Sequence, residues 1–355
     1  MVRVGIMGAT GYTGLELLRI LTQHPGVEVC WVGSESFPDV KLEDYCPAWR
    51  GRSSLTLQKQ EIEKLEGVEV IFLALPSGVA MDYVPFLLSR GIRIIDLGAD
   101  FRLKNVEAFQ KYYRLEHRIP YLLQEAVYGI PEIYGEELKM ARLVANPGCY
   151  PTSVIIPLYP FLKEKVISPS IIVDSKSGVT GAGRKPTEDN QFCEVDENFK
   201  AYKVGEHRHQ PEIKEQLELA AREEVNLIFT PYLLPLKRGI LTTIYITLEK
   251  DIKTPVVPSK ILSIMSAGKP VLATMNLDGD APELIKKANC GYVFEAGDSK
   301  SLANGILRLY KNESLRKKLG ENGRKYIEEH LSVKTAAEKY EKLFIEVITK
   351  NNKTK

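Results

Sequence analysis

The feature that most constrains the fold of this chain is a run of three glycines near its amino terminus. Gly8, Gly11 and Gly14 follow a short apolar run, Val2 to Met7, and precede leucines that recur at helical spacing. A strand, a G-x-x-G-x-x-G loop and a helix, in this order, predict a dinucleotide site, because bare backbone amides at a helix N-terminus can approach a pyrophosphate. A tight turn without a ligand is the alternative. The expected cofactor contacts of the loop are Gly8, Thr10, Gly11, Tyr12, Thr13 and Gly14.

The segment after the second expected strand bears on which dinucleotide binds. About twenty residues beyond the glycine loop, the chain reads VGSES, with Ser34, Glu35 and Ser36. Hydroxyls of Ser34 and Ser36 suit a 2′-phosphate, whereas Glu35 favours NAD if its carboxylate faces the ribose. We therefore predict NADP(H) as the cofactor.

Strand-like and helical runs alternate in the first part of the chain, whose 355 residues predict two or three domains. Apolar runs at Val27 to Val32, Val68 to Leu75 and Ile92 to Leu97 predict a parallel, doubly wound α/β sheet of the Rossmann type. Beyond it, three strand-like segments are close enough in sequence to pair antiparallel, which predicts an α+β domain: Ile171 to Ser177, Val225 to Leu234 and Ile240 to Leu248. Lys-rich amphipathic helices follow. The expected domains are 1–145, 146–252 and 253–348, with 349–355 as a disordered tail.

Charge and cysteine usage narrow the class of function. With 48 Lys and Arg against 46 Asp and Glu, the formal charge of +2 gives no reason to expect nucleic acid or an anionic membrane as partner. No run approaches the ~20 apolar residues of a membrane span, so we expect a cytoplasmic enzyme acting on a small molecule. The five cysteines are scattered, without CxxC or grouping with histidine, which predicts reduced thiols and no metal site.

Cys149 is the candidate nucleophile. It follows Pro147 and Gly148 and precedes an apolar run, Val154 to Leu162, that predicts a helix. A cysteine at a helix N-terminus is expected to have a lowered thiol pKa, and its thiolate can attack a carbonyl. A small buried hydrophobe is the alternative.

Histidines and arginines supply candidate partners for this cysteine. In GEHRHQPEI, His207 or His209 can act as general acid/base, with a helix cap or a solvated pair as the alternative. Three arginines stand in segments suited to bidentate anion recognition, although surface ion pairing is the commoner role: Arg102 in DLGADFRL, Arg184 in SGVTGAGRK and Arg238 in PLKRGI.

Together these motifs resemble the N-acetyl-γ-glutamyl-phosphate reductase family, from Met1 to about Asp251. The resemblance rests on GATGYTG, LALPSG, DLGADFRL, NPGCYPT, SKSGVTGAGRKP, EHRHQPEI and PLKRGILTTIY. It implies a fold of the glyceraldehyde-phosphate and aspartate-semialdehyde dehydrogenase type. The implied reaction, in arginine biosynthesis, is the NADPH-dependent reduction of an acyl phosphate to a semialdehyde through a thioester on Cys149, in a homo-oligomer (dimer or tetramer). A related substrate, glutamyl or aminoadipyl phosphate on a carrier protein, stays open.

The same resemblance implies further contacts. Pro76 and Ser77 of LALPSG are expected at the cofactor. The expected substrate contacts are Arg102, Ser177, Gly178, Arg184, Lys185 and Arg238.

From about Pro255 the chain resembles the C-terminal part of a GT-B glycosyltransferase. The resemblance rests on VPSKILSIMSAGKPVLAT, APELIKKANCGYVFEAGDSKSLANGI and LRKKLGENGRKYIEEHLS. It implies vestigial nucleotide-sugar contacts at Ser259, Lys260 and Glu283, in a foreign α/β half-domain that replaces the reductase C-terminus. We therefore expect a fusion whose reductase activity is impaired, or a nucleotide-sugar-binding fragment joined to an inactive reductase.

Overall fold

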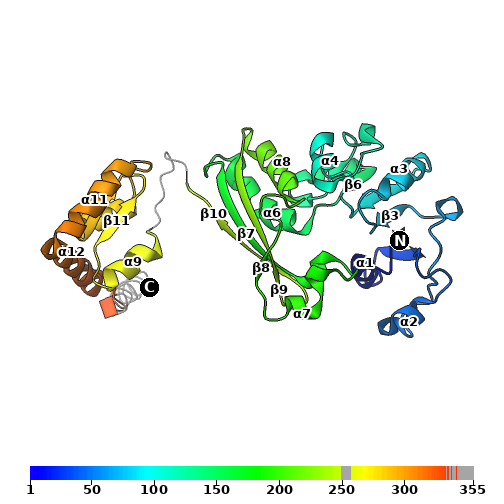
Figure 1. Cartoon of the computed structure of the whole chain (residues 1–355), viewed down its shortest axis with the longest axis horizontal. Coiled ribbons are helices and arrows are strands. Elements are labelled where there is room, and N and C mark those ends of the chain that lie inside the picture. Colours follow the sequence, from blue (N-terminus) through cyan, green and yellow to red (C-terminus); the bar gives the residue numbers. More distant parts are fainter. Residues whose placement is uncertain (249–256, 333, 336, 338–340, 342–355) are drawn as a thin grey trace, which may run out of the picture. The chain divides into compact units, whose positions relative to one another are not determined.

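The computed structural model describes residues 1–248, 257–332, 334, 335, 337 and 341. The chain divides into two compact units, Met1–Thr247 and Leu248–Lys355 (Figure 1). The expected disordered tail, 349–355, and the expected domain boundary at residues 252–253 lie outside the described residues.

The first unit begins with a six-stranded parallel sheet of order β2-β1-β3-β4-β6-β5, which confirms the predicted Rossmann-type architecture. Its strands are β1 (Val2–Met7), β2 (Val27–Gly33), β3 (Val70–Leu73), β4 (Arg93–Asp96), β5 (Val127–Tyr128) and β6 (Leu143–Ala145). The connecting helices are α1 (Tyr12–Leu21), α2 (Leu42–Tyr45), α3 (Ala80–Ser89), α4 (Val106–Tyr113) and α5 (Pro131–Met140). The strands β5 and β6 are short and were not expected from the sequence.

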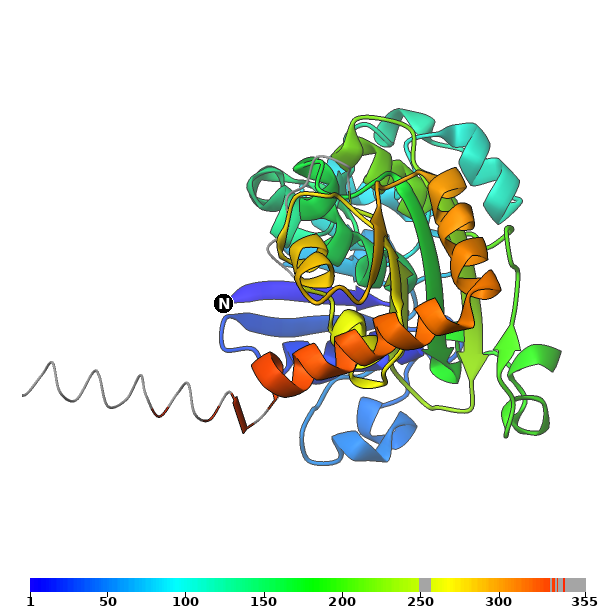
Figure 2. The same cartoon turned by 90° about the vertical axis from the view of Figure 1, so that its left-hand side faces the viewer.

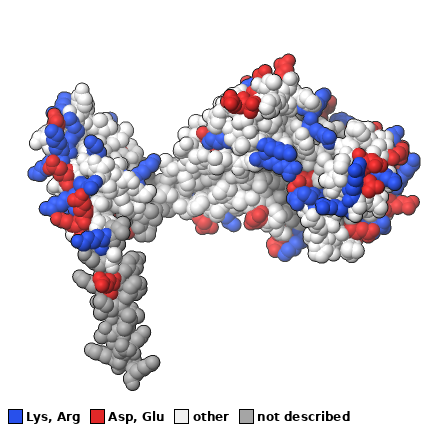
Figure 3. All heavy atoms as spheres, turned by 90° about the horizontal axis from the view of Figure 1, so that it is seen from below, with Lys and Arg blue, Asp and Glu red and all other residues white. Residues whose placement is uncertain are grey.

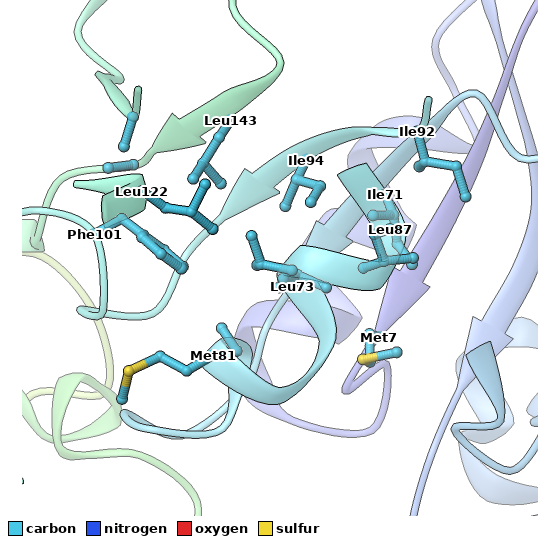
Figure 4. Close-up of a cluster of buried hydrophobic side chains, with 14 of the residues drawn as sticks. Met7, Ile71, Leu73, Met81, Leu87, Ile92, Ile94, Phe101, Leu122 and Leu143 are labelled. Atoms are coloured by element: carbon cyan, nitrogen blue, oxygen red, sulfur yellow. The ribbon is translucent and has the colours of Figure 1, made fainter. Parts of the chain in front are cut away.

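An apolar layer between α3 and the sheet holds the centre of this region rigid (Figure 4). Ile71 and Leu73 of β3 and Ile94 of β4 are fully buried against Met81 and Leu87 of α3. Burial of such side chains stabilises the fold by roughly 1.5–3 kcal/mol each. The parallel strands therefore end at one fixed edge, where ligands of open α/β sheets bind.

A four-stranded sheet of order β10-β7-β9-β8 forms the rest of the first unit. Its strands are β7 (Ser170–Gly178), β8 (Lys200–Ala201), β9 (Asn226–Leu234) and β10 (Ile240–Tyr245), and its helices are α6 (Cys149–Lys163), α7 (Phe192–Val195) and α8 (Gln210–Ala221). The sequence-based expectation of antiparallel pairing holds for β7 with β10 and is wrong for β7 with β9, which pair in parallel. The helix α8 lies between them in the chain and supplies the long crossover that parallel neighbours need.

The second unit is built on a two-stranded parallel sheet, β11 (Val271–Thr274) and β12 (Gly291–Phe294). Helices α9 (Ser259–Ser266), α10 (Asp280–Lys287), α11 (Ser299–Lys311) and α12 (Glu313–Tyr326) pack around it (Figure 2), followed by a π-helical turn, Ile327–Leu331. Its buried centre includes Ile261, Met265 and Ile285. The unit thus has an apolar core of its own.

The surface carries charges of both signs. Basic side chains lie among acidic ones on the face drawn in Figure 3, in keeping with the formal charge of +2. Throughout the described part of the chain, every helix is too short or too polar to cross a bilayer.

Candidate active site

The glycine loop follows β1 and has the shape of a phosphate cradle. Gly8 has a φ of +80°, and a Cβ there would lie 2.4 Å from the Ala74 carbonyl oxygen. A Cβ on Gly14 would lie 2.3 Å from the Gly8 carbonyl oxygen. Gly11 meets only that oxygen, at 3.5 Å, and caps α1, so the amide end of the helix stays free of side-chain bulk. These features fit the pyrophosphate of a dinucleotide.

The two serines that were expected near the ribose differ in position. Ser34 is buried, its hydroxyl lies 3.1 Å from that of Thr10, and it accepts a bond from the Phe37 amide at 3.3 Å. Ser34 therefore serves the packing of the loop. Ser36 and Glu35 are exposed, so both are available to a ligand.

Pro76 and Ser77 follow β3 at the same edge of the sheet. The next residue, Gly78, donates its amide to Asp100 at 2.7 Å, which ties this turn to the loop after β4. Ser77 lines a cavity that includes no residue of the glycine loop.

Cys149 is the first residue of α6, and Gly148 caps the helix. The residue is exposed and lines a cavity of about 330 Å³ together with Ser177, His207 and His209. The surrounding protein nevertheless raises the pKa of the Cys149 thiol, because desolvation outweighs the Tyr150 amide and the Arg102 charge, which lower it. The expectation of a lowered thiol pKa was wrong for this reason.

Both predicted histidines reach this cavity, and both are neutral. Burial and the positive charge of Arg208 lower the pKa of His207 to about 3, while burial and Arg102 lower that of His209 well below its usual value. His207 is committed to the protein, because its Nδ1 accepts the His209 amide at 3.1 Å. The Nε2 of His209 lies over the residue before the nucleophile, so that a Cβ on Gly148 would be 2.6 Å from it. The His209 imidazole thus lies next to the residue that precedes Cys149.

Glu212 supports the turn before Cys149 and was not predicted from the sequence. It is 1% exposed and lies in the first turn of α8. Its Oε1 accepts the Gly148 amide at 2.8 Å and the Tyr128 hydroxyl at 2.7 Å. The signal was its position three residues after His209, which places both on one side of the same helix turn.

Arg102 holds the nucleophile turn and does not line the cavity. Its Nε donates to the Asn146 carbonyl at 2.8 Å, and its second nitrogen donates to the Leu97 carbonyl at 2.7 Å. The remaining nitrogen lies 3.5 Å from Glu212 Oε2. The guanidinium of Arg102 is buried and bonded to these protein groups. Arg102 is therefore not the substrate-anion contact that was expected.

The other two arginines also point away from the Cys149 cavity. Arg184 donates to the Thr10 carbonyl at 2.9 Å and to the Tyr45 hydroxyl, so it contacts the glycine loop. Arg238 is exposed and pairs with Glu16 of α1 at 3.4 Å. Lysine and arginine side chains that were not predicted line the cavity instead: Lys200, Lys203 and Arg208.

Of the remaining predicted substrate contacts, one lines the Cys149 cavity and two do not. Ser177 lines the cavity, and its hydroxyl donates to the Gly178 carbonyl at 3.0 Å. Gly178 has no room for a side chain, because a Cβ would lie 2.8 Å from the Leu236 carbonyl oxygen. Lys185 is exposed outside the cavity.

The three predicted nucleotide-sugar residues lie at helix starts in the second unit. Ser259 and Lys260 open α9. Glu283 lies in the first turn of α10 and pairs with Lys287 at 3.1 Å. Within the described ranges, no group of His, Cys, Asp and Glu is arranged to hold a metal ion.

Comparison with known proteins gives two family matches. The family described as semialdehyde dehydrogenase, NAD binding domain, matches residues 3–141. The semialdehyde dehydrogenase, dimerisation domain, matches residues 149–290, which extends past the boundary between the two units.

Curated relatives share much more than the fold. The N-acetyl-γ-glutamyl-phosphate reductase of Magnetococcus marinus is 49% identical over 246 residues, covering 69% of this chain and 70% of the relative. That of Caldicellulosiruptor saccharolyticus is 47% identical over 253 residues, 71% and 74% of the two chains. That of Desulfotalea psychrophila is 45% identical over 285 residues, 79% and 82%.

Solved structures support the fold. The aspartate semialdehyde dehydrogenase II of Vibrio cholerae, complexed with ASA, has a TM-score of 0.54 at 14% identity and covers 77% of this chain and 81% of its own. The Candida albicans aspartate semialdehyde dehydrogenase with NADP has a TM-score of 0.53 at 14% identity, with 78% and 82% covered.

Proposed function

Because the chain belongs to the N-acetyl-γ-glutamyl-phosphate reductase family, we propose that it reduces N-acetyl-γ-glutamyl phosphate to the γ-semialdehyde and phosphate. Cys149 is the nucleophile, His209 is the acid/base, and NADPH is the reductant. The observation that carries this proposal is the cavity that Cys149 shares with His209, at the sheet edge where the glycine loop also ends. Residues 1–145 bind the dinucleotide in this proposal, and residues 146–252 bind the substrate.

The protonation states determine the first step. Cys149 rests as a thiol and His209 as a neutral imidazole, so His209 accepts the thiol proton as the sulfur attacks the acyl carbon. The carbon–oxygen bond to phosphate breaks, phosphate leaves with the electron pair, and a thioester on Cys149 remains. Bound NADPH supplies the hydride that reduces this thioester. The imidazolium of His209 returns its proton to the sulfur when the carbon–sulfur bond breaks and the aldehyde forms.

The dinucleotide binds through the residues of the glycine loop in this proposal. The amides around Gly11 and the start of α1, with Thr10, Tyr12 and Thr13, face the pyrophosphate. The exposed Ser36 hydroxyl favours a 2′-phosphate and hence NADP(H) over NAD(H).

Turnover in the oxidative direction tests the function. The purified chain, supplied with the semialdehyde, NADP and phosphate, is expected to form NADPH, followed by its absorbance, and Cys149→Ala is expected to abolish the reaction. Mass spectrometry of the protein with the acyl phosphate alone should find the acyl group on Cys149. The carrier-linked glutamyl or aminoadipyl phosphate, supplied in parallel, distinguishes the alternative substrate. Failure to form NADPH in a chain that binds NADP would overturn the proposal.

Self-association belongs to the same proposal. The outer face of the second sheet exposes Ile228 (51%), with Ile172 and Tyr245 beside it in register, and Leu241 (66%), which lies opposite Lys176. Apolar patches of this kind mark interaction surfaces, and a second copy of the chain fits the family description of a dimerisation domain. Ile228→Asp should lower the mass measured by sedimentation. Leu219→Asp, an equally exposed change on α8, should not.

For residues 257–332 we propose a remnant nucleotide-sugar half-site in a replaced C-terminus. The helix α10, which carries Glu283, begins at the carboxyl end of β11, the edge at which α/β sheets bind ligands. The helix α9, with Ser259 and Lys260, packs against β11. In this proposal the replacement weakens dinucleotide binding by the first unit. Calorimetry with a panel of nucleotide sugars tests the half-site, and the absence of heat with all of them rejects it.

A further inference from the structure

A second cavity, of about 720 Å³, lies in the first unit outside the glycine loop. The last residues of α4 form one wall, and the loop before α8 forms the other. Ser77 lies between them. The residues that matter for its charge are Lys111, Arg114, Lys203, Arg208 and Glu206.

This cavity gathers positive charge that the protein does not neutralise. Lys111, Arg114, Lys203 and Arg208 line it, against a single carboxylate, Glu206. Among the residues that the structure describes, none of the four cations has a carboxylate oxygen within ion-pair distance. By contrast, the nearby Lys200 pairs with Asp189 at 2.6 Å. Four like charges around one cavity repel one another, and a bound anion relieves that repulsion.

Two tyrosines shape the cavity between these charges. The Nζ of Lys111 lies 5.4 Å from the centre of the Tyr112 ring, and the guanidinium of Arg208 lies 5.9 Å from that of Tyr113. The cavity volume falls in the range of about 300–1,000 Å³ that is typical of small-molecule sites. The cavity thus has room for an organic group beside an anionic one.

The cavity borders the catalytic one without including its nucleophile. Lys203 and Arg208 line both cavities, whereas Lys111 and Arg114 line only this one and Cys149 only the other. Arg208 stands in the chain between His207 and His209. An anion held here therefore changes the charge beside the catalytic histidines without occupying the substrate position.

We propose that the basic cavity between α4 and the 203–208 loop binds a small phosphate monoester, and that Lys203 and Arg208 couple its occupancy to the catalytic cavity. Guanidinium and ammonium groups bind phosphate oxygens through charge-assisted bonds. The site goes beyond the proposed reaction because Cys149 does not line it, although Ser77, an expected cofactor contact, does.

Calorimetry on the full chain tests the site, with inorganic phosphate and glycerol phosphate as the probes. The Lys111→Gln/Arg114→Gln double variant is expected to bind glycerol phosphate at least about tenfold more weakly. A matched double variant, Arg90→Gln/Lys139→Gln, removes two exposed charges elsewhere in the first unit and is expected to bind as the unchanged chain does.

The outcomes separate this site from the catalytic one. Unchanged binding in the Lys111/Arg114 variant, or equal losses in both double variants, overturns the proposal. A loss in His209→Gln without a loss in the Lys111/Arg114 variant places the anion in the catalytic cavity and also overturns it. Coupling is measured with turnover: glycerol phosphate should change the KM of the unchanged chain, and the Lys111/Arg114 variant should lose that change. The reductase proposal is tested by turnover in the absence of this anion. A failure of the anion site can therefore be told apart from a failure of the reductase proposal.

Discussion

The glycine loop and the turn before Cys149 lie at the same edge of one sheet, yet they are held in opposite ways. The conformation of the loop depends on its own residues, because Gly8 and Gly14 lie so close to neighbouring backbone atoms that neither has room for a Cβ. The turn is fixed from outside, by Arg102 and Glu212, which lie 44 and 64 residues away from the groups that they bind. Short-range pattern therefore specifies the first element, whereas the second depends on the assembled fold.

Glu212→Ala is expected to give the largest effect, because it removes the outside support of the turn. It leaves the buried Arg102 guanidinium without its carboxylate and the Gly148 amide without an acceptor. Breaking a buried pair in this way costs about 3–5 kcal/mol of unfolding free energy, measurable by urea denaturation. Glu212→Gln keeps an acceptor for Gly148 and Tyr128 and should recover part of the loss. Equal losses in the two variants would contradict a role for the charge.

Gly14→Ala tests the loop that is fixed from within. Its Cβ would lie 2.3 Å from the Gly8 carbonyl oxygen and 2.7 Å from Ala9 Cα. Overpacking of this kind costs about 1–3 kcal/mol, and we expect NADPH to bind at least about tenfold more weakly in a fluorescence titration. Gly135→Ala, outside the loop, is the matched control, since a Cβ there would meet nothing within 4 Å. Normal NADPH binding by Gly14→Ala, or an equal loss of binding in both variants, would contradict the assignment.

The neutral His207 makes the catalytic region sensitive to acid. Its pKa is lowered to about 3 in the folded chain, from an ordinary value of 6.5, so the unfolded chain binds the proton first as the pH falls. Its contribution to stability is fully present above pH 6.5 and is lost progressively toward pH 3. We expect this residue alone to reduce the unfolding free energy by roughly 2 kcal/mol at pH 5, relative to neutral pH. His207→Asn should flatten that slope, whereas His24→Asn, at an exposed site, should leave it unchanged.

Ser36→Ala gives the smallest expected effect and sharpens the account of the loop. Loss of one exposed hydroxyl should weaken NADPH binding by up to about tenfold and leave NADH binding unchanged, as measured by the same titration. Ser34→Ala is the comparison, because the Ser34 hydroxyl bonds to Thr10 and Phe37 inside the loop. Its loss should lower the stability of the loop and so weaken the binding of NADPH and NADH alike. An equal loss of NADH binding in Ser36→Ala would remove the argument for the 2′-phosphate.

The sequence predicted those parts of the molecule that depend on neighbouring residues. The strands at Val27 and Ile240, the loop at Gly8 and the helix that begins near Cys149 follow from local pattern. The proximity of Cys149 to the two histidines followed from the family resemblance, and the two histidines line its cavity.

What the sequence did not predict depends on contacts between distant segments. Arg102 was expected at an anion, and its partner Glu212 lies 110 residues further along the chain. The thiol pKa of Cys149 rises because the surrounding protein desolvates it, and a helix terminus alone does not predict this. The parallel pairing of β7 with β9 likewise required knowledge of the path of α8.

The first turn of α8 has one further consequence. It carries the imidazole of His209 on one residue and, through Glu212, grips the backbone amide beside the nucleophile. The spacing between the His209 imidazole and the turn that carries the sulfur is therefore set by how α8 packs against α6.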